Sequence, residues 1–243
     1  MKTMHDDILN YAKRLKLSWI PQHYQEIEAQ SQQEFLLKLV EAEVTQREEK
    51  KLNQLLKQST LPTVSGESFL WDDIQLPSGI TKDFLLQGDF LKHKTNLIFY
   101  GGVGTGKTFL STLIGLTIIR TQAKKVKFYT VASLVNALLE ANTNGNLGKL
   151  MKQLSKLDLL ILDELGYIPL HKQGGELLFQ VISMCYETRS IIITTNLQFG
   201  QWNHVFGDQI LTEAVVDRLI HHSHLLIFNG ESHRYKQSIL NSK

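Results

Sequence analysis

Cysteine is almost absent from this chain of 243 residues, which contains a single one, Cys185. One cysteine cannot form an internal disulfide, and its scarcity fits a reducing compartment. Cys185 lies in the segment FQVISMCYE, which is typical of a helix packed on a core. We therefore expect a buried, unreactive thiol.

Long apolar runs are also absent. The runs at residues 97–100, 159–162 and 191–193 have the length of strands, far short of a membrane span. The N-terminal segment MKTMHDDILNYAKRLKLSW is charged within its first turns and lacks the continuous apolar core of a signal peptide. These absences predict a cytoplasmic protein without a membrane partner.

An excess of charge of one sign is missing too, because the net charge is only +2. A nucleic-acid role would therefore need local basic patches. Hydrophobic residues make up 42% and charged residues 21% of the chain, which argues against wholesale disorder. The length allows one large domain with a small appendage.

Residues 1–65 are predicted to form a small all-helical N-terminal domain and linker. Apolar residues recur there at helical spacing: Phe35, Leu36, Leu39, Val40, Val44, Leu52, Leu55 and Leu56. The segment TLPTVSGES (60–68) then breaks the pattern with Pro, Gly and Ser. Because acids and bases balance over residues 1–60, the region is a helical appendage, a dimerising element or a DNA contact that its charge does not reveal.

Residues 66–243 show a different pattern. Short apolar runs alternate with longer helical segments: NLIFY, VKFYT, LLILD, IIITT and LLIF. Such alternation indicates βαβ units and a parallel sheet covered on both faces. The predicted fold class of this second domain is α/β.

A phosphate-binding motif follows the first of these runs. The segment GGVGTGKT matches G-x-x-x-x-G-K-[ST] in full, with a strand before it and a helix-forming stretch after it. Glycines let backbone N–H groups surround the phosphates, and the following helix offers its positive end. The predicted nucleotide-binding residues are Gly101, Gly102, Val103, Gly104, Thr105, Gly106, Lys107 and Thr108, with Lys107 on the β/γ-phosphates and Thr108 on Mg²⁺.

Two adjacent acids end the apolar run Leu159–Leu162. Asp163 can hold Mg²⁺ beside the phosphate loop, and Glu164 can activate the attacking water. This pair favours an ATPase over a kinase, which transfers phosphate to a bound acceptor. In the next run, SIIITTN, the polar residues Thr194, Thr195 and Asn196 could contact the γ-phosphate or the water.

Taken in order, the segments GGVGTGKT, LLILDELGY, IIITTNLQFGQW and LTEAVVDRLIHHSHLLIFNGESHRYK resemble the IstB family of transposition helper ATPases over about residues 66–243. They are more distantly similar to the helicase loader DnaC and the initiator DnaA. The resemblance implies a P-loop AAA+ fold with a five-stranded parallel sheet of order 5-1-4-3-2 flanked by helices. It also implies a homo-oligomer with ATP at the subunit interfaces.

The same resemblance assigns Asn196 to the sensor 1 position, Arg218 to the arginine finger and Arg234 to sensor 2. A guanidinium from a neighbouring subunit suits the γ-phosphate because its planar fork binds oxygens in pairs. Arg189, in YETRSIII, remains a second candidate for this trans arginine. Only 15 residues follow the run LLIF, so we expect no C-terminal lid domain, as in the IstB and DnaC pattern.

Basic residues between the second and third runs are candidates for DNA contact. Lys149, Lys152 and Lys156 are spaced so that one helix could present all three on one face. In initiator-type AAA+ proteins this region follows a nucleic-acid backbone, and lysine–phosphate contacts are independent of sequence. A solvated lysine face is the alternative.

Three histidines, His221, His222 and His224, stand close together in IHHSH. No cysteine or carboxylate lies at ligand spacing beside them, so the sequence does not predict a metal site there.

The combined prediction is an ATP- and Mg²⁺-dependent ATPase that oligomerises on double-stranded DNA and recruits or activates a partner transposase. No transposase-like set of carboxylates is evident in the chain itself. The first alternative is a replicative helicase loader that acts on a helicase and single-stranded DNA. A P-loop kinase of small molecules is a third hypothesis, which the adjacent Asp163 and Glu164 oppose.

Overall fold

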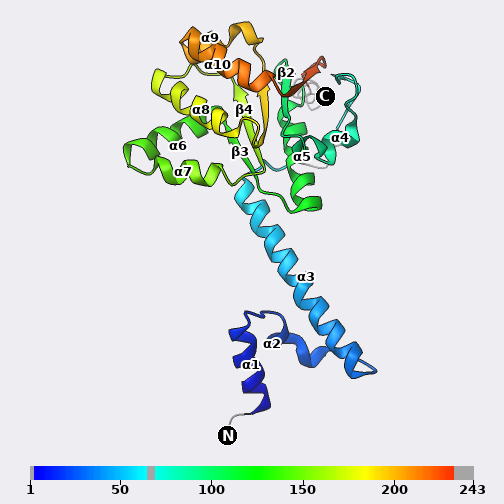
Figure 1. Ribbon diagram of the computed structural model, residues 1–243. Helices are drawn as coiled ribbons and strands as arrows, with labels where there is room; N and C mark the ends of the chain where they lie inside the picture. Colours follow the sequence, from blue (N-terminus) through cyan, green and yellow to red (C-terminus); the bar gives the residue numbers. More distant parts are fainter. Residues whose placement is uncertain (1–2, 65–68, 233–243) are drawn as a thin grey trace, which may run out of the picture. The chain divides into compact units, whose positions relative to one another are not determined.

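The computed structural model describes residues 3–64 and 69–232, and the chain divides into two compact units (Figure 1). The first unit is Met1–Gln54 and the second is Leu55–Lys243. Their boundary falls inside the long helix α3 (Gln32–Ser59), whereas the sequence placed the domain boundary between residues 65 and 66.

Helices account for all regular structure among the described residues of the first unit. They are α1 (Met4–Arg14), α2 (Ile20–His23), the 3-10 turn η1 (Tyr24–Glu26) and the first part of α3. Helix α1 begins with a capping box, because Thr3 accepts the N–H of Asp6 and the Asp6 carboxylate accepts the N–H of Thr3. The predicted helical character of this region is confirmed.

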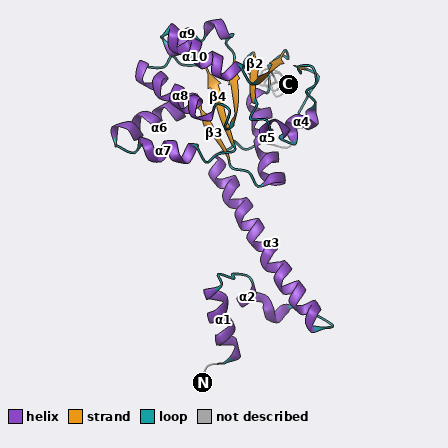
Figure 2. Cartoon of the chain, viewed as in Figure 1, coloured by secondary structure: helices purple, strands orange, loops and turns teal. Residues whose placement is uncertain are grey.

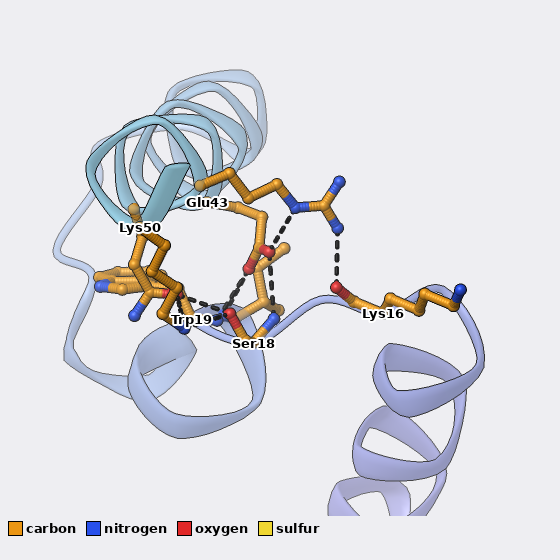
Figure 3. Close-up of polar contacts among 8 residues, drawn as sticks. Lys16, Ser18, Trp19, Glu43 and Lys50 are labelled. Carbon is orange, nitrogen blue, oxygen red and sulfur yellow. Dashed lines mark hydrogen bonds and ion pairs between the residues drawn. The ribbon is translucent and has the colours of Figure 1, made fainter. Parts of the chain in front are cut away.

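A buried carboxylate, Glu43 of α3, ties the first unit together (Figure 3). It accepts the backbone N–H groups of Ser18, Trp19 and Ile20 over 2.8–3.2 Å, and the Nε–H of Arg47 at 3.0 Å. Burial alone raises the pKa of Glu43, but these donors together outweigh it, so the pKa lies below its ordinary value. The carboxylate thereby caps the N-terminal end of α2, which has no side-chain cap of its own.

Apolar burial contributes little to this unit. Ala12 is its single buried apolar side chain among the described residues, while Leu36, Val40 and Val44 of the predicted stripe are exposed. The helix of the sequence prediction is therefore present, but its apolar stripe is only partly covered within this unit. Polar contacts such as those of Glu43 carry a correspondingly larger share of its stability.

The second unit is built on a six-stranded sheet of order β1-β6-β2-β5-β4-β3. Its strands are β1 (Ile74–Gln75), β2 (Asn96–Gly101), β3 (Val126–Thr130), β4 (Leu159–Leu165), β5 (Ser190–Thr195) and β6 (Ser223–Phe228). Strands β2 to β6 are parallel, and numbering them 1 to 5 gives 5-1-4-3-2, which confirms the implied topology. The count of five strands was wrong by one, because two-residue β1 pairs antiparallel with β6 and is too short to leave a periodic pattern.

Helices cover both faces of this sheet (Figure 2). Alternate residues of β4 face opposite layers: Ile161 lies against Gly115 of α5, while Leu160 and Leu162 pack in a cluster with α6, α8 and α10. The helices of this unit are α4 (Lys82–Leu86), η2 (Asp89–Leu91), α5 (Lys107–Gln122), α6 (Val131–Thr143), α7 (Leu147–Leu154), α8 (Lys172–Cys185), η3 (Phe199–Gln201), α9 (Asn203–Phe206) and α10 (Gln209–Ile220).

Burial of both faces explains the near-continuous apolar strands of the sequence. Cys185, at the end of α8, is buried in the same cluster, and burial raises the pKa of its thiol to about 11. No lid helix follows β6 in the described residues, which extend to Ser232. Over the same ranges, the chain has no helix long and apolar enough to cross a membrane.

We expect Glu43→Gln to destabilise the first unit by about 1–3 kcal/mol, because an amide cannot accept all four donors and buried N–H groups lose their partner. Because folding lowers the pKa of Glu43, its contribution is present above the ordinary glutamate pKa and is lost as the pH falls through the lowered value. Hydrogen exchange of residues 16–24 at neutral pH measures the effect. The exposed Glu41→Gln, on the same helix, is the matched control, and equal protection in both variants would contradict the role of Glu43.

Candidate nucleotide site

The sequence-predicted phosphate loop, acids and Thr-Thr-Asn segment meet at one edge of the sheet. The phosphate loop follows β2, the two acids lie near the end of β4, and the Thr-Thr-Asn segment lies at the end of β5. These three strands are neighbours in the order β2-β5-β4. Because these strands are parallel, their carboxyl ends lie at the same edge, where open α/β sheets bind their ligands.

The phosphate loop connects the end of β2 to the start of α5. Gly104 and Gly106 have φ of +77° and +95°, which side chains other than glycine rarely adopt. At Gly106 a Cβ would also come within 3.0 Å of the Phe69 ring. No side chain caps α5, so its first N–H groups remain available to an anion.

Lys107, the first residue of α5, is buried at the base of the loop. Its ammonium donates to the carbonyls of Gly101 and Gly102 at 2.8 and 2.5 Å. These contacts hold the positive charge inside the glycine loop, where the sequence placed the β/γ-phosphates.

Asp163 is the buried centre of the site. Both of its carboxylate oxygens lie 3.0 Å from the hydroxyl of Thr108, and Oδ1 also accepts the hydroxyl of Thr194 at 2.5 Å. Asp163 is 3% exposed, so these contacts compensate for its lost hydration. The set offers the oxygen ligands that hard divalent cations prefer.

Glu164 follows Asp163 at an irregularity in the sheet. The register of β4 against β5 shifts between Leu162 and Leu165, and Glu164 has a φ of +63°, an uncommon value for a residue with a side chain. The shift releases the Glu164 N–H from the ladder, and the hydroxyl of Thr194 accepts it at 2.9 Å. The Glu164 side chain is exposed and lines the cavity of the phosphate loop.

Thr194 is the residue that sequence reasoning undervalued. The sequence assigned a role to Asn196, whereas Thr194 makes the contacts with both acids. Asn196 follows β5 and is half-buried, and its Oδ1 has no hydrogen-bond partner among the described residues. Only the strand register, which sequence does not supply, distinguishes the two positions.

A cavity of about 380 Å³ adjoins the loop. Its lining includes apolar residues that sequence reasoning missed, namely Pro62, Val64, Phe69, Leu70 and Phe109, together with Thr63, Thr112 and Tyr167. The Phe69 ring stacks on Phe109, with centroids 5.6 Å apart and planes 9° apart. The cavity therefore joins a phosphate-binding loop to an apolar, aromatic wall, as a nucleotide with a flat base requires.

The candidate arginines lie elsewhere. Arg218, near the end of α10, places its guanidinium 4.6 Å from the Phe179 ring centroid and donates one bond, to the Ala214 carbonyl. Arg189 donates through Nε, Nη1 and Nη2 to the carbonyls of Ser155 and Thr188. Arg234 lies outside the described residues.

The candidate DNA-contacting lysines are exposed. Lys149 and Lys152 belong to α7, but the helix ends at Leu154, so Lys156 lies beyond its C-cap. The expectation of one helical face with three lysines was therefore wrong, since the helix ends two residues before Lys156. None of the three forms an ion pair within the described ranges.

Comparisons with known proteins agree with this geometry. The family model described as IstB-like ATP binding protein matches residues 12–241. A protein of insertion sequence IS5376 of Geobacillus stearothermophilus, named as ATP-binding, is 37% identical over 86% of this chain and 84% of its own. Its counterpart from insertion sequence IS21 of Pseudomonas aeruginosa is 33% identical over 92% of this chain and 87% of its own.

Solved structures support the fold. The DnaC helicase loader superimposes with a TM-score of 0.51 and 25% identity, over 57% of this chain and 80% of its own. AMPPCP-bound DnaA from Aquifex aeolicus gives a TM-score of 0.52 at 18% identity, over 65% of this chain and 48% of its own. The chain therefore belongs to the family of IstB-like ATP-binding proteins and has the AAA+ fold.

We expect Thr194→Val to weaken ATP binding in the presence of Mg²⁺ by about 10-fold or more, because it removes the acceptor of the Glu164 N–H and leaves Asp163 with the Thr108 hydroxyl alone. Thr194→Ser keeps the hydroxyl and should bind nearly as the wild type does. Calorimetric titration with a non-hydrolysable ATP analogue measures both. Equal affinity of the Val and Ser variants would show that the hydroxyl does not organise the acids.

Proposed function

We propose that this member of the IstB-like ATP-binding family hydrolyses ATP, assembles on double-stranded DNA and recruits or activates a partner transposase. The observation that carries the proposal is the contact of Asp163 with Thr108 and Thr194, directly beside Glu164. The relatives named for insertion sequences support transposition as the setting.

In the proposed reaction Glu164 acts as general base. It takes a proton from the water whose oxygen attacks the γ-phosphorus, while the bond from phosphorus to the bridging oxygen breaks and ADP leaves with the electron pair. Lys107 binds the β/γ-phosphates and neutralises part of their charge. Thr108 and Asp163 would hold Mg²⁺, which would neutralise further charge on the phosphates.

Arg218 is proposed to complete this site in a neighbouring subunit. It precedes β6 at the amino edge of the sheet, whereas the phosphate loop follows β2 at the carboxyl edge. Within the described residues, Arg218 donates to the Ala214 carbonyl and lies over the Phe179 ring, and these contacts are easier to exchange for phosphate than the three bonded nitrogens of Arg189. Asn196 and Arg234 remain proposed contacts of the γ-phosphate.

Lys149, Lys152 and Lys156 are proposed to bind the DNA backbone. They are exposed and lack carboxylate partners within the described ranges, so their charges are available to phosphates. Such contacts would be independent of sequence and weakened by salt.

The helicase loader is the second candidate, and its support is the similarity to DnaC. The two hypotheses differ in the nucleic acid and the protein client. ATP-dependent assembly on duplex rather than single-stranded DNA, with stimulation of the transposase from the same insertion sequence, supports the first. Preference for single strands and capture of a replicative helicase would support the second.

We expect Glu164→Gln to bind ATP and duplex DNA but to lose nearly all ATP turnover, so that DNA-bound oligomers persist. The amide keeps the shape of the side chain but cannot accept the proton from water. Phosphate release and electron microscopy with ATP, Mg²⁺ and duplex DNA measure the two effects. Lys107→Ala, which should not bind ATP, is the control, and wild-type turnover in Glu164→Gln would refute the base assignment.

Mixing Arg218→Ala with Lys107→Ala subunits should restore part of the ATPase activity that each variant lacks alone. The rescue is expected because an interface between them can pair an intact phosphate loop with an intact Arg218. Arginine fingers contribute about 10³–10⁵ in rate, so even one mixed interface is detectable. Arg120→Ala, on the exposed face of α5, serves as control, and no rescue at any ratio would indicate a local role for Arg218.

A further inference from the structure

Two turns at the edge of the sheet opposite the nucleotide site bring together a possible ligand set. Glu187 lies between α8 and β5, and His221 and His222 lie between α10 and β6. One ligand atom from each residue lies within 4.8 Å of the others. No metal site was expected here from the sequence, because the carboxylate comes from a segment distant from the histidines.

The fold holds these turns in a fixed relation through Asn96, the buried first residue of β2. Its amide donates to the Leu219 carbonyl at 3.3 Å, and its side-chain oxygen accepts the Ile191 N–H at 2.9 Å. Its own N–H donates to the His222 carbonyl at 2.7 Å. Because β2 pairs with both β5 and β6, the backbones that carry the three side chains cannot drift apart independently.

The side chains are close to the spacing that a bound ion requires. His222 Nε2 lies 3.6 Å from Glu187 Oε1, and the two histidine rings meet edge to face with centroids 4.4 Å apart. Ligands of a tetrahedral Zn²⁺ are separated by roughly 3.4 Å, given bonds of about 2.0–2.1 Å. Small side-chain rotations therefore suffice to bring all three to one ion.

An outer partner is also in place. The Tyr186 hydroxyl lies 3.1 Å from Nδ1 of His221, as the hydrogen-bonded partners of metal-binding histidines commonly do. It leaves Nε2 of His221 for the ion. His224, in contrast, is half-buried edge-on to Phe84 and is not a member of the set.

We propose that Glu187, His221 and His222 form a binding site for a divalent transition-metal ion, Zn²⁺ in particular. Two imidazoles and one carboxylate are the donors that Zn²⁺ accepts, whereas Mg²⁺ prefers oxygen alone. All three residues are exposed, so water completes the coordination. The ion ties the α8–β5 turn to the α10–β6 turn. The second of these turns directly follows α10, the helix that carries Arg218.

The test is titration of the chelator-treated, full-length protein with Zn²⁺ alone, without nucleotide or Mg²⁺, read by calorimetry. We expect one ion per chain whose affinity falls by more than about 10-fold in Glu187→Gln and in His222→Ala, and by about 10-fold in Tyr186→Phe. The control variants His224→Gln and His23→Ala, the latter from the exposed His23–Glu26 pair, should bind as the wild type does.

Co²⁺ in place of Zn²⁺ gives a second readout that does not involve ATPase activity. Its visible absorption should appear with the wild type and disappear with Glu187→Gln, while binding of an ATP analogue with Mg²⁺ at the opposite edge shows that the variant is folded. Unchanged Zn²⁺ affinity in Glu187→Gln and His222→Ala, or loss of binding in His23→Ala instead, would overturn the proposal. Neither result bears on the proposed ATPase.

Discussion

The buried carboxylate of Asp163 is the constraint on which the nucleotide site depends. A carboxyl group that is 3% exposed needs hydrogen-bond partners, and the partners of Asp163 are two hydroxyls from different elements. Thr108 brings the start of α5, and with it the phosphate loop, against β4. Thr194 brings β5 against β4 as well. It also accepts the Glu164 N–H, which fixes the backbone of the second acid. One buried carboxyl group thus sets the relation between β4, β5 and the start of α5.

Asn96 has a comparable role at the opposite edge of the same strands. It is buried at the start of β2 and uses its side chain and its N–H to hold the turns that lead into β5 and β6. The parallel sheet is therefore fixed at both ends by polar residues, while its middle is apolar. Polar residues are concentrated at the edges because strand ends leave backbone groups without ladder partners.

Sequence reasoning succeeded where chemistry is encoded locally and failed where it depends on register. The glycine loop, Lys107 and the pair Asp163–Glu164 are contiguous in sequence, so their site could be predicted, and the resemblance supplied the strand order. The role of Thr194 arises from an irregularity between β4 and β5 that no local pattern announces. Glu187 likewise meets His222 only because β5 and β6 both pair with β2.

The two edges of the sheet also constrain how copies of the chain could assemble. Arg218 and the phosphate loop are separated by the length of β2, which at six residues is about 20 Å, more than an arginine side chain spans. If Arg218 meets a γ-phosphate, it therefore meets that of another copy. The resulting contact joins the amino edge of one sheet to the carboxyl edge of the next, which is a heterologous interface. Such interfaces generate rings when the rotation closes and helices when it does not, and a helix of subunits can follow the backbone of a DNA duplex.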